Sequence, residues 1–136
     1  MKGFLGLSLL LASASAAATS VEVADNDFAW LPPLQSRGNS GLTAEAITTI
    51  HRLVTDGQCK LEGQSGADLD MSVPFAAHFT PDGSLDKIVI KRLGCPKVEG
   101  ILGGVLLEMF ARGEFRATGA NEDGWYRSQL SFASHV

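Results

Sequence analysis

The sequence predicts an α+β fold: a three-stranded antiparallel sheet made by a hairpin, a helix and a final strand, with the helix packed on one face and an additional N-terminal helix. Three observations lead to this prediction. Apolar residues occupy every second position across residues 71–79, which is the period of a half-buried strand. A Pro-Asp-Gly turn at 81–83 separates this stretch from residues 85–93, which are rich in β-branched side chains. Apolar residues then recur at every third or fourth position from Val98 to Phe110, a helical pattern.

The helix after the hairpin should begin at Pro96, which suits a first helical turn, and end before Gly113. Its interior holds three glycines, and each costs about 0.5–1 kcal/mol relative to alanine. Close packing on the sheet would compensate for them, so Gly104→Leu should overpack this contact. We expect the packed face to contain Ile101, Leu102, Val105 and Met109.

Two more elements flank this core. Residues 42–56 form an amphipathic pattern that Thr43 can cap and Gly57 can end, which predicts the additional helix. Residues 125–132 alternate again and are expected to form the third strand. Its buried face should carry Tyr126, Leu130 and Phe132.

The length of 136 residues fits one domain, which we place at residues 42–136. Residues 19–41 contain prolines and a glycine-rich loop and are expected to form an irregular N-terminal tail that lays Trp30 and Leu34 on the domain. Residues 1–18 have a positive start at Lys2, a short apolar run and small residues near a cleavage point. That pattern predicts a secretory signal peptide, a periplasmic or secreted protein, and no stable membrane anchor after cleavage.

The cysteine content predicts a disulfide, and the net charge argues against one class of partner. The chain has two cysteines, Cys59 and Cys95, and an even count in an exported protein predicts one disulfide. The formal net charge is −4 and the basic residues are scattered, so no nucleic-acid partner is expected.

Residues suited to catalysis are few and do not form a motif. The histidines His51, His78 and His135 do not have the spacing of a zinc site. Asp68 and Asp70 resemble a fragment of a calcium loop that lacks its other ligands. His78 or Asp82 could act as a base, but no motif selects either of them. We therefore predict a binding protein and not an enzyme, with no cofactor and no metal.

The stretch VPFAAHFTPDGSLDKIVI at 73–90 resembles the hairpin of TonB C-terminal domains. Gly94-Cys95-Pro96 stands where these domains often have a glycine and a proline before the helix. Residues 114–117 resemble their helix exit, although Ala117 replaces the usual proline. The resemblance covers residues 71–132, about half of the chain, and implies the TonB C-terminal fold. A signal peptide in place of the family's anchor and proline-rich spacer implies binding without energy transduction.

The resemblance also implies a binding mode, in which the last strand of the domain pairs with an extended segment of an outer-membrane receptor. Here the protein-binding residues would be Trp125, Arg127, Gln129 and Ser131, on the outer face of residues 125–132. The expected partner is a protein or extended peptide, such as an outer-membrane receptor, or a second copy in a homodimer. Two alternatives stay open. The 119–126 loop could act in an inhibitor or structural accessory protein, or the N-terminal tail could cover the edge.

Overall fold

The computed structural model describes residues 19–37, 42–61, 64–65, 68–117 and 123–134. The expected signal peptide lies outside these residues. The described residues form two helices, α1 (Ala44–Thr55) and α2 (Pro96–Ala111), and seven strands. The strands are β1 (Ser20–Ala24), β2 (Gln35–Ser36), β3 (Gln64–Ser65), β4 (Asp68–Phe79), β5 (Leu85–Lys91), β6 (Phe115–Arg116) and β7 (Trp125–Ser134). Helix α1 follows β2, and α2 follows β5.

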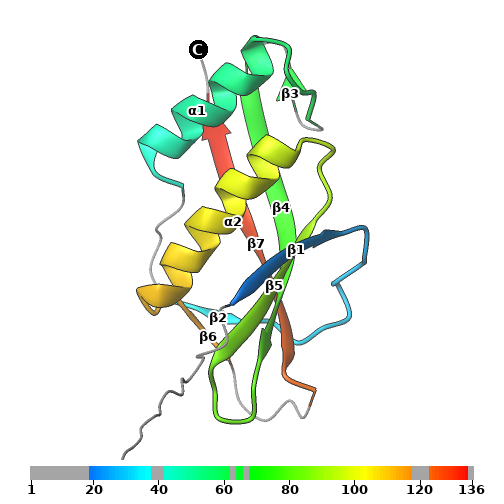
Figure 1. Ribbon diagram of the computed structural model, residues 1–136, viewed down its shortest axis with the longest axis vertical. Helices are drawn as coiled ribbons and strands as arrows, with labels where there is room; N and C mark the ends of the chain where they lie inside the picture. The colour runs from blue at the N-terminus through cyan, green and yellow to red at the C-terminus, as the bar shows by residue number, and fades with distance from the viewer. Residues whose placement is uncertain (1–18, 38–41, 62–63, 66–67, 118–122, 135–136) are drawn as a thin grey trace, which may run out of the picture.

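The main sheet is mixed and five-stranded, so the α+β class holds but the expected three-stranded antiparallel sheet is wrong. Long β4 lies at its centre and pairs antiparallel with β5 on one side and β7 on the other (Figure 1). Strand β1 adds in parallel to the far side of β5, and β3 contributes two residues beside the start of β4. Strands β2 and β6 form a separate two-stranded sheet.

Two of the additional strands, β1 and β2, come from residues 19–37, where the sequence predicts an irregular tail. Val21 pairs with Ile88 and Val23 with Ile90 in the parallel β1–β5 ladder. Strand β1 has only five residues, and its pairing is with a strand far away in the sequence, so local periodicity gives little sign of it. The main sheet thus includes residues that precede position 42.

Both helices cover the same face of the sheet (Figure 1). The alternating residues of β4 point toward them, and Val73, Phe75 and Ala77 are buried as the sequence pattern predicts. Tyr126, Leu130 and Phe132 of β7 are buried on the same side, also as predicted. The core is completed by residues of both helices and β5: Ile50, Val54, Ile88, Ile90, Val98, Leu102, Leu106 and Met109.

The helix ends follow the sequence signals. The Thr43 side chain accepts a hydrogen bond from the Ala46 amide at 3.1 Å and caps α1. Gly57 and Gly113 lie just past the two helices with φ of 76° and 75°, the left-handed region that glycine tolerates.

The α2 face differs from the expected one. Leu106 is buried, whereas Val105 is only half-buried. Gly103 is the glycine that meets the sheet. Gly104 is exposed, and a Cβ added there would have no atom within 4 Å, so the expected overpacking by Gly104→Leu is wrong.

The predicted disulfide is confirmed: Cys59 is bonded to Cys95, with their Cα atoms 5.6 Å apart. It joins the segment after α1 to the residue that precedes α2. The Lys97 ammonium adds a hydrogen bond to the Gln58 side-chain oxygen at 2.9 Å in the same region. Within the described residues, no helix is long and apolar enough to cross a membrane.

Candidate functional site

The four residues predicted to bind protein all lie on β7, with side chains on the face of the sheet opposite the helices. Their register places Trp125 beside His78 and Gln129 beside Pro74 on β4. Gln129 and Ser131 are exposed, whereas Trp125 and Arg127 are half-buried. Strand β7 pairs only with β4 in a ladder, so its other side forms an edge of the sheet.

This edge is covered at one point by the chain's own N-terminal segment. The Arg127 amide donates to the Pro32 carbonyl oxygen at 2.9 Å, and the Arg127 carbonyl oxygen accepts from the Leu34 amide at 2.8 Å. The bridge between Pro33 and Arg127 is parallel. The Arg127 side chain adds a hydrogen bond from Nε to the Leu31 carbonyl oxygen at 2.7 Å. The backbone of Arg127 is therefore occupied.

Past Arg127 the edge runs uncovered among the described residues. Backbone groups alternate sides along a strand. Because those of Arg127 point outward, those of Gln129, Ser131 and Ala133 point outward too. None of these three has an outer backbone hydrogen bond to a described residue. After Leu34 the chain continues into β2, which pairs with β6 and not with β7. The uncovered edge, residues 129–133, is thus the part of β7 that an extended peptide could join.

The side chains along the uncovered edge do not protect it. Sheet edges usually carry lysine, proline or inward-pointing charge that discourages pairing with another chain. Here the outer face presents Gln129, Ser131 and Ala133, which are neutral and exposed. The Ser131 hydroxyl lies 3.2 Å from that of Ser72 on β4. A neutral edge of this kind would not repel an added strand through like charge.

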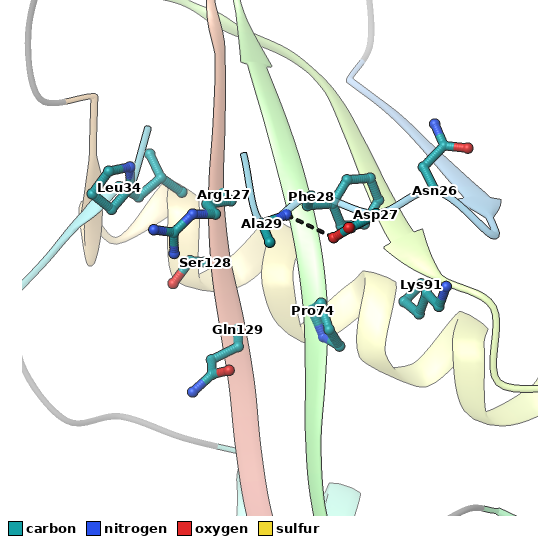
Figure 2. A pocket seen from close by; sticks show the side chains of 11 residues that line it. Asn26, Asp27, Phe28, Ala29, Leu34, Pro74, Lys91, Arg127, Ser128 and Gln129 are labelled. Atoms are coloured by element: carbon teal, nitrogen blue, oxygen red, sulfur yellow. Dashed lines mark hydrogen bonds between the residues drawn. The ribbon is translucent and has the colours of Figure 1, made fainter. Parts of the chain in front are cut away.

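A pocket of about 470 Å³ adjoins the uncovered edge on the open face of the sheet. Figure 2 shows Arg127 and Gln129 projecting from β7 and Pro74 from β4, with Phe28, Asp27 and Ala29 beside them. The β4–β5 ladder ends at the Phe75–Ile90 pair, next to Pro74. Proline has no amide hydrogen to continue it. The pocket therefore opens where the central strands separate.

His78 and Asp82, the two candidate bases, both make hydrogen bonds within the β4–β5 hairpin. His78 Nδ1 lies 2.6 Å from an Asp86 carboxylate oxygen, and its ring contacts that of Trp125 at 4.8 Å between centroids. In the described part of the chain, no hydroxyl or thiol is hydrogen-bonded to His78. The Asp82 carboxylate accepts from the Thr80 hydroxyl and from the Ser84 amide within the hairpin turn, and these bonds lower its pKa.

The described residues contain no group of three or more histidine, cysteine, aspartate or glutamate side chains that could hold a metal ion. Residues 118–122, which make up most of the alternative 119–126 binding loop, lie outside the described part of the chain.

Two features of the structure are not among the sequence predictions. One is the hydrogen bonding of residues 32–34 to the Arg127 backbone. The Pro-Pro pair at 32–33 indicates a loop but not this contact. The other is Glu99, which is 6% exposed and accepts from the amides of Leu93 and Gly94 at 2.6 and 3.1 Å. An acidic residue in a first helical turn is the sequence signal for such a contact.

Comparison with known proteins gives no relative: no family model, no curated protein and no solved structure matches this chain.

Proposed function

We propose that this protein is a small exported binding module, resembling a TonB C-terminal domain, that takes up an extended protein segment at the uncovered edge of β7. The observation that carries the proposal is the outward direction of the Gln129, Ser131 and Ala133 backbone groups, which have no outer hydrogen bond to a described residue. Strand addition to such an edge gives affinity through main-chain hydrogen bonds and specificity through alternate side chains.

The geometry of this edge supports a short, extended partner segment. Residues 129–133 offer three outward residues, so a segment of about five residues can pair with them. Coverage of Arg127 by residues 32–34 fixes one end of the available edge, since an incoming strand would meet Leu34 there. Partner side chains that point to the open face would lie beside Gln129 and Ser131. Because these two residues are polar and uncharged, the partner side chains need not carry charge.

The cellular setting is part of the proposal. The pattern of residues 1–18 and the Cys59–Cys95 bond are compatible with export to an oxidising compartment such as the periplasm. In that setting the partner would be a periplasmic or outer-membrane protein with an accessible extended segment.

The test is site-specific photo-crosslinking in the source cells. A benzophenone amino acid at Ser131 should capture a partner, whereas the same group at Glu108, exposed on α2, should not. Gln129→Pro deletes one outward amide and should abolish this capture, while Gln129→Ala should preserve it. Capture that persists in Gln129→Pro would contradict strand addition. A crosslinked product of two copies of the chain would show that the added strand comes from a second copy, in a homodimer.

A further inference from the structure

The open face of the sheet carries a second pocket, which we call the aromatic pocket. Its volume is about 280 Å³. It lies between residues 26–31 and the strands β4, β5 and β7. Its lining is Asn26, Asp27, Phe28, Trp30, Leu31, Ala76, Val89 and Trp125. Trp125 lies four residues before Gln129, the first residue of the uncovered edge, which separates the pocket from that edge by roughly 13 Å along β7.

The floor of the aromatic pocket is well packed. Phe28, Leu31, Ala76 and Val89 are buried and form a separate small core on this face. Residues 27–31 are held in turns: the Ala29 amide donates to the Asp27 carboxylate at 2.9 Å, and the Leu31 amide to the Phe28 carbonyl oxygen at 3.0 Å. This scaffold supports Trp30 in an outward position.

Trp30 is unusual in its exposure. Its side chain is 77% exposed, and it is the only large apolar residue among those described that is exposed. Leaving an indole ring in water forgoes the burial of a large apolar area. An exposed tryptophan beside a preformed pocket is typical of an interaction site.

The charge of the lining selects the ligand. Asp27 is the only charged residue of the aromatic pocket, and no described cation lies within ion-pair distance of it. The nearby cations have other contacts: Lys91 donates to the Asp25 carbonyl oxygen and Arg127 to that of Leu31. Lys91 and Arg127 line the other pocket, of about 470 Å³, which lies on the Pro74 side of residues 26–29. Aromatic rings with a carboxylate attract a cation that also has apolar surface.

We propose that the aromatic pocket binds an arginine side chain of a partner protein. A guanidinium is planar, stacks on indole rings and can hydrogen-bond to the Asp27 carboxylate at its edge. A small free cation in the pocket would leave most of the Trp30 side chain in water. A partner protein that carries the arginine would also cover the exposed indole ring of Trp30. Tryptophan and arginine are also the residues most enriched among those that dominate interface energies. The aromatic pocket shares Asn26, Asp27 and Phe28 with the pocket that adjoins the uncovered edge, but none of its lining residues lies on that edge.

The experiment uses the only two tryptophans of the chain, Trp30 and Trp125, which both line the aromatic pocket. The peptide Gly-Arg-Gly, titrated into the protein, should give saturable shifts of the indole NMR signals of both. The isosteric peptide with citrulline keeps the planar shape without the charge. It should bind about threefold more weakly, the ratio expected for an exposed cation–π contact.

Matched variants complete the test. Trp30→Ala should lose the binding. Asp27→Asn keeps the acceptor for the Ala29 amide but should reduce the preference for arginine over citrulline, and Gln129→Ala should change nothing. Equal binding of the two peptides, or no shift of either indole, would overturn the proposal. Saturable shifts with tetramethylammonium but not with Gly-Arg-Gly would overturn the proposal that a partner's arginine binds here. They would point instead to a small ammonium ligand.

Discussion

Gly103 of α2 and Val21 of β1 are in such close contact that a Cβ on Gly103 would lie 2.9 Å from Val21 Cγ1. This contact joins the helix to the edge strand that local sequence patterns do not reveal. It also distinguishes Gly103 from Gly100 and Gly104, where a Cβ would have no atom within 4 Å.

Gly103→Ala is therefore expected to destabilise the protein by about 1–3 kcal/mol through overpacking. Gly104→Ala should instead stabilise it by about 0.5–1 kcal/mol, because alanine is the better helix former at an open position. Urea unfolding of the two variants measures the difference. Adding Val21→Ala to Gly103→Ala should recover part of the loss. If both glycine variants had the same stability, the α2–β1 contact would be wrong.

Removal of the disulfide should cost stability but keep the fold. The Cys59–Cys95 bond spans a sequence separation of 36, for which the chain-entropy relation gives about 3–4 kcal/mol. Cys59→Ser combined with Cys95→Ser should lower the unfolding free energy by this amount while the far-ultraviolet spectrum stays native. Wild type in reductant is the matched control. Unchanged unfolding in both samples would contradict the stabilising role.

The buried Glu99 carboxylate should be important for the turn between β5 and α2. Glu99→Ala leaves the Leu93 and Gly94 amides without their acceptor, and we expect a loss of about 2–3 kcal/mol. Glu99→Gln retains one carbonyl acceptor and should cost less. Thermal unfolding of the two variants provides the comparison, and an alanine variant as stable as wild type would show that water replaces the carboxylate.

The hairpin turn should be weaker in acid. Hydrogen bonds from the Thr80 hydroxyl and from Ser84 lower the pKa of Asp82 from its ordinary value of 3.8. A carboxyl with a lowered pKa in the folded state adds stability above its unfolded pKa, and this contribution is lost as the pH falls through the folded value. Asp82→Asn should remove this part of the pH dependence. A carboxyl NMR titration of Asp82 with a midpoint at or above 3.8 would contradict the assignment.

Patterns along the chain predict the elements that short-range chemistry determines. The alternation through Phe75, the Thr43 cap and the glycine after each helix all lie where the sequence indicates. The cysteine pair was predictable because only two cysteines exist.

Pairings between distant segments could not be predicted in this way. The parallel contact of Val21 with Ile88 and the bond from Leu34 to Arg127 depend on how far-apart segments meet, and neither leaves a periodic signal. The same reason explains why the candidate site is only partly predictable. The sequence indicates the outer face of β7, but the part of its edge that residues 32–34 occupy follows from tertiary structure alone.

Strand addition at β7 requires that the Gln129, Ser131 and Ala133 amides are open to a partner strand. Amide hydrogen exchange measured by NMR tests it most directly. In the free protein these amides should exchange fast, whereas those of Ser128, Leu130 and Phe132, which point to β4, should be protected. Arg127, already bonded to Pro32, is the internal control.

On addition of the partner captured through Ser131, exchange at Gln129 and Ser131 should slow at least tenfold, about 1.4 kcal/mol of added protection, while Arg127 stays unchanged. Exchange at these two amides that is equally fast with and without the bound partner would contradict strand addition at β7.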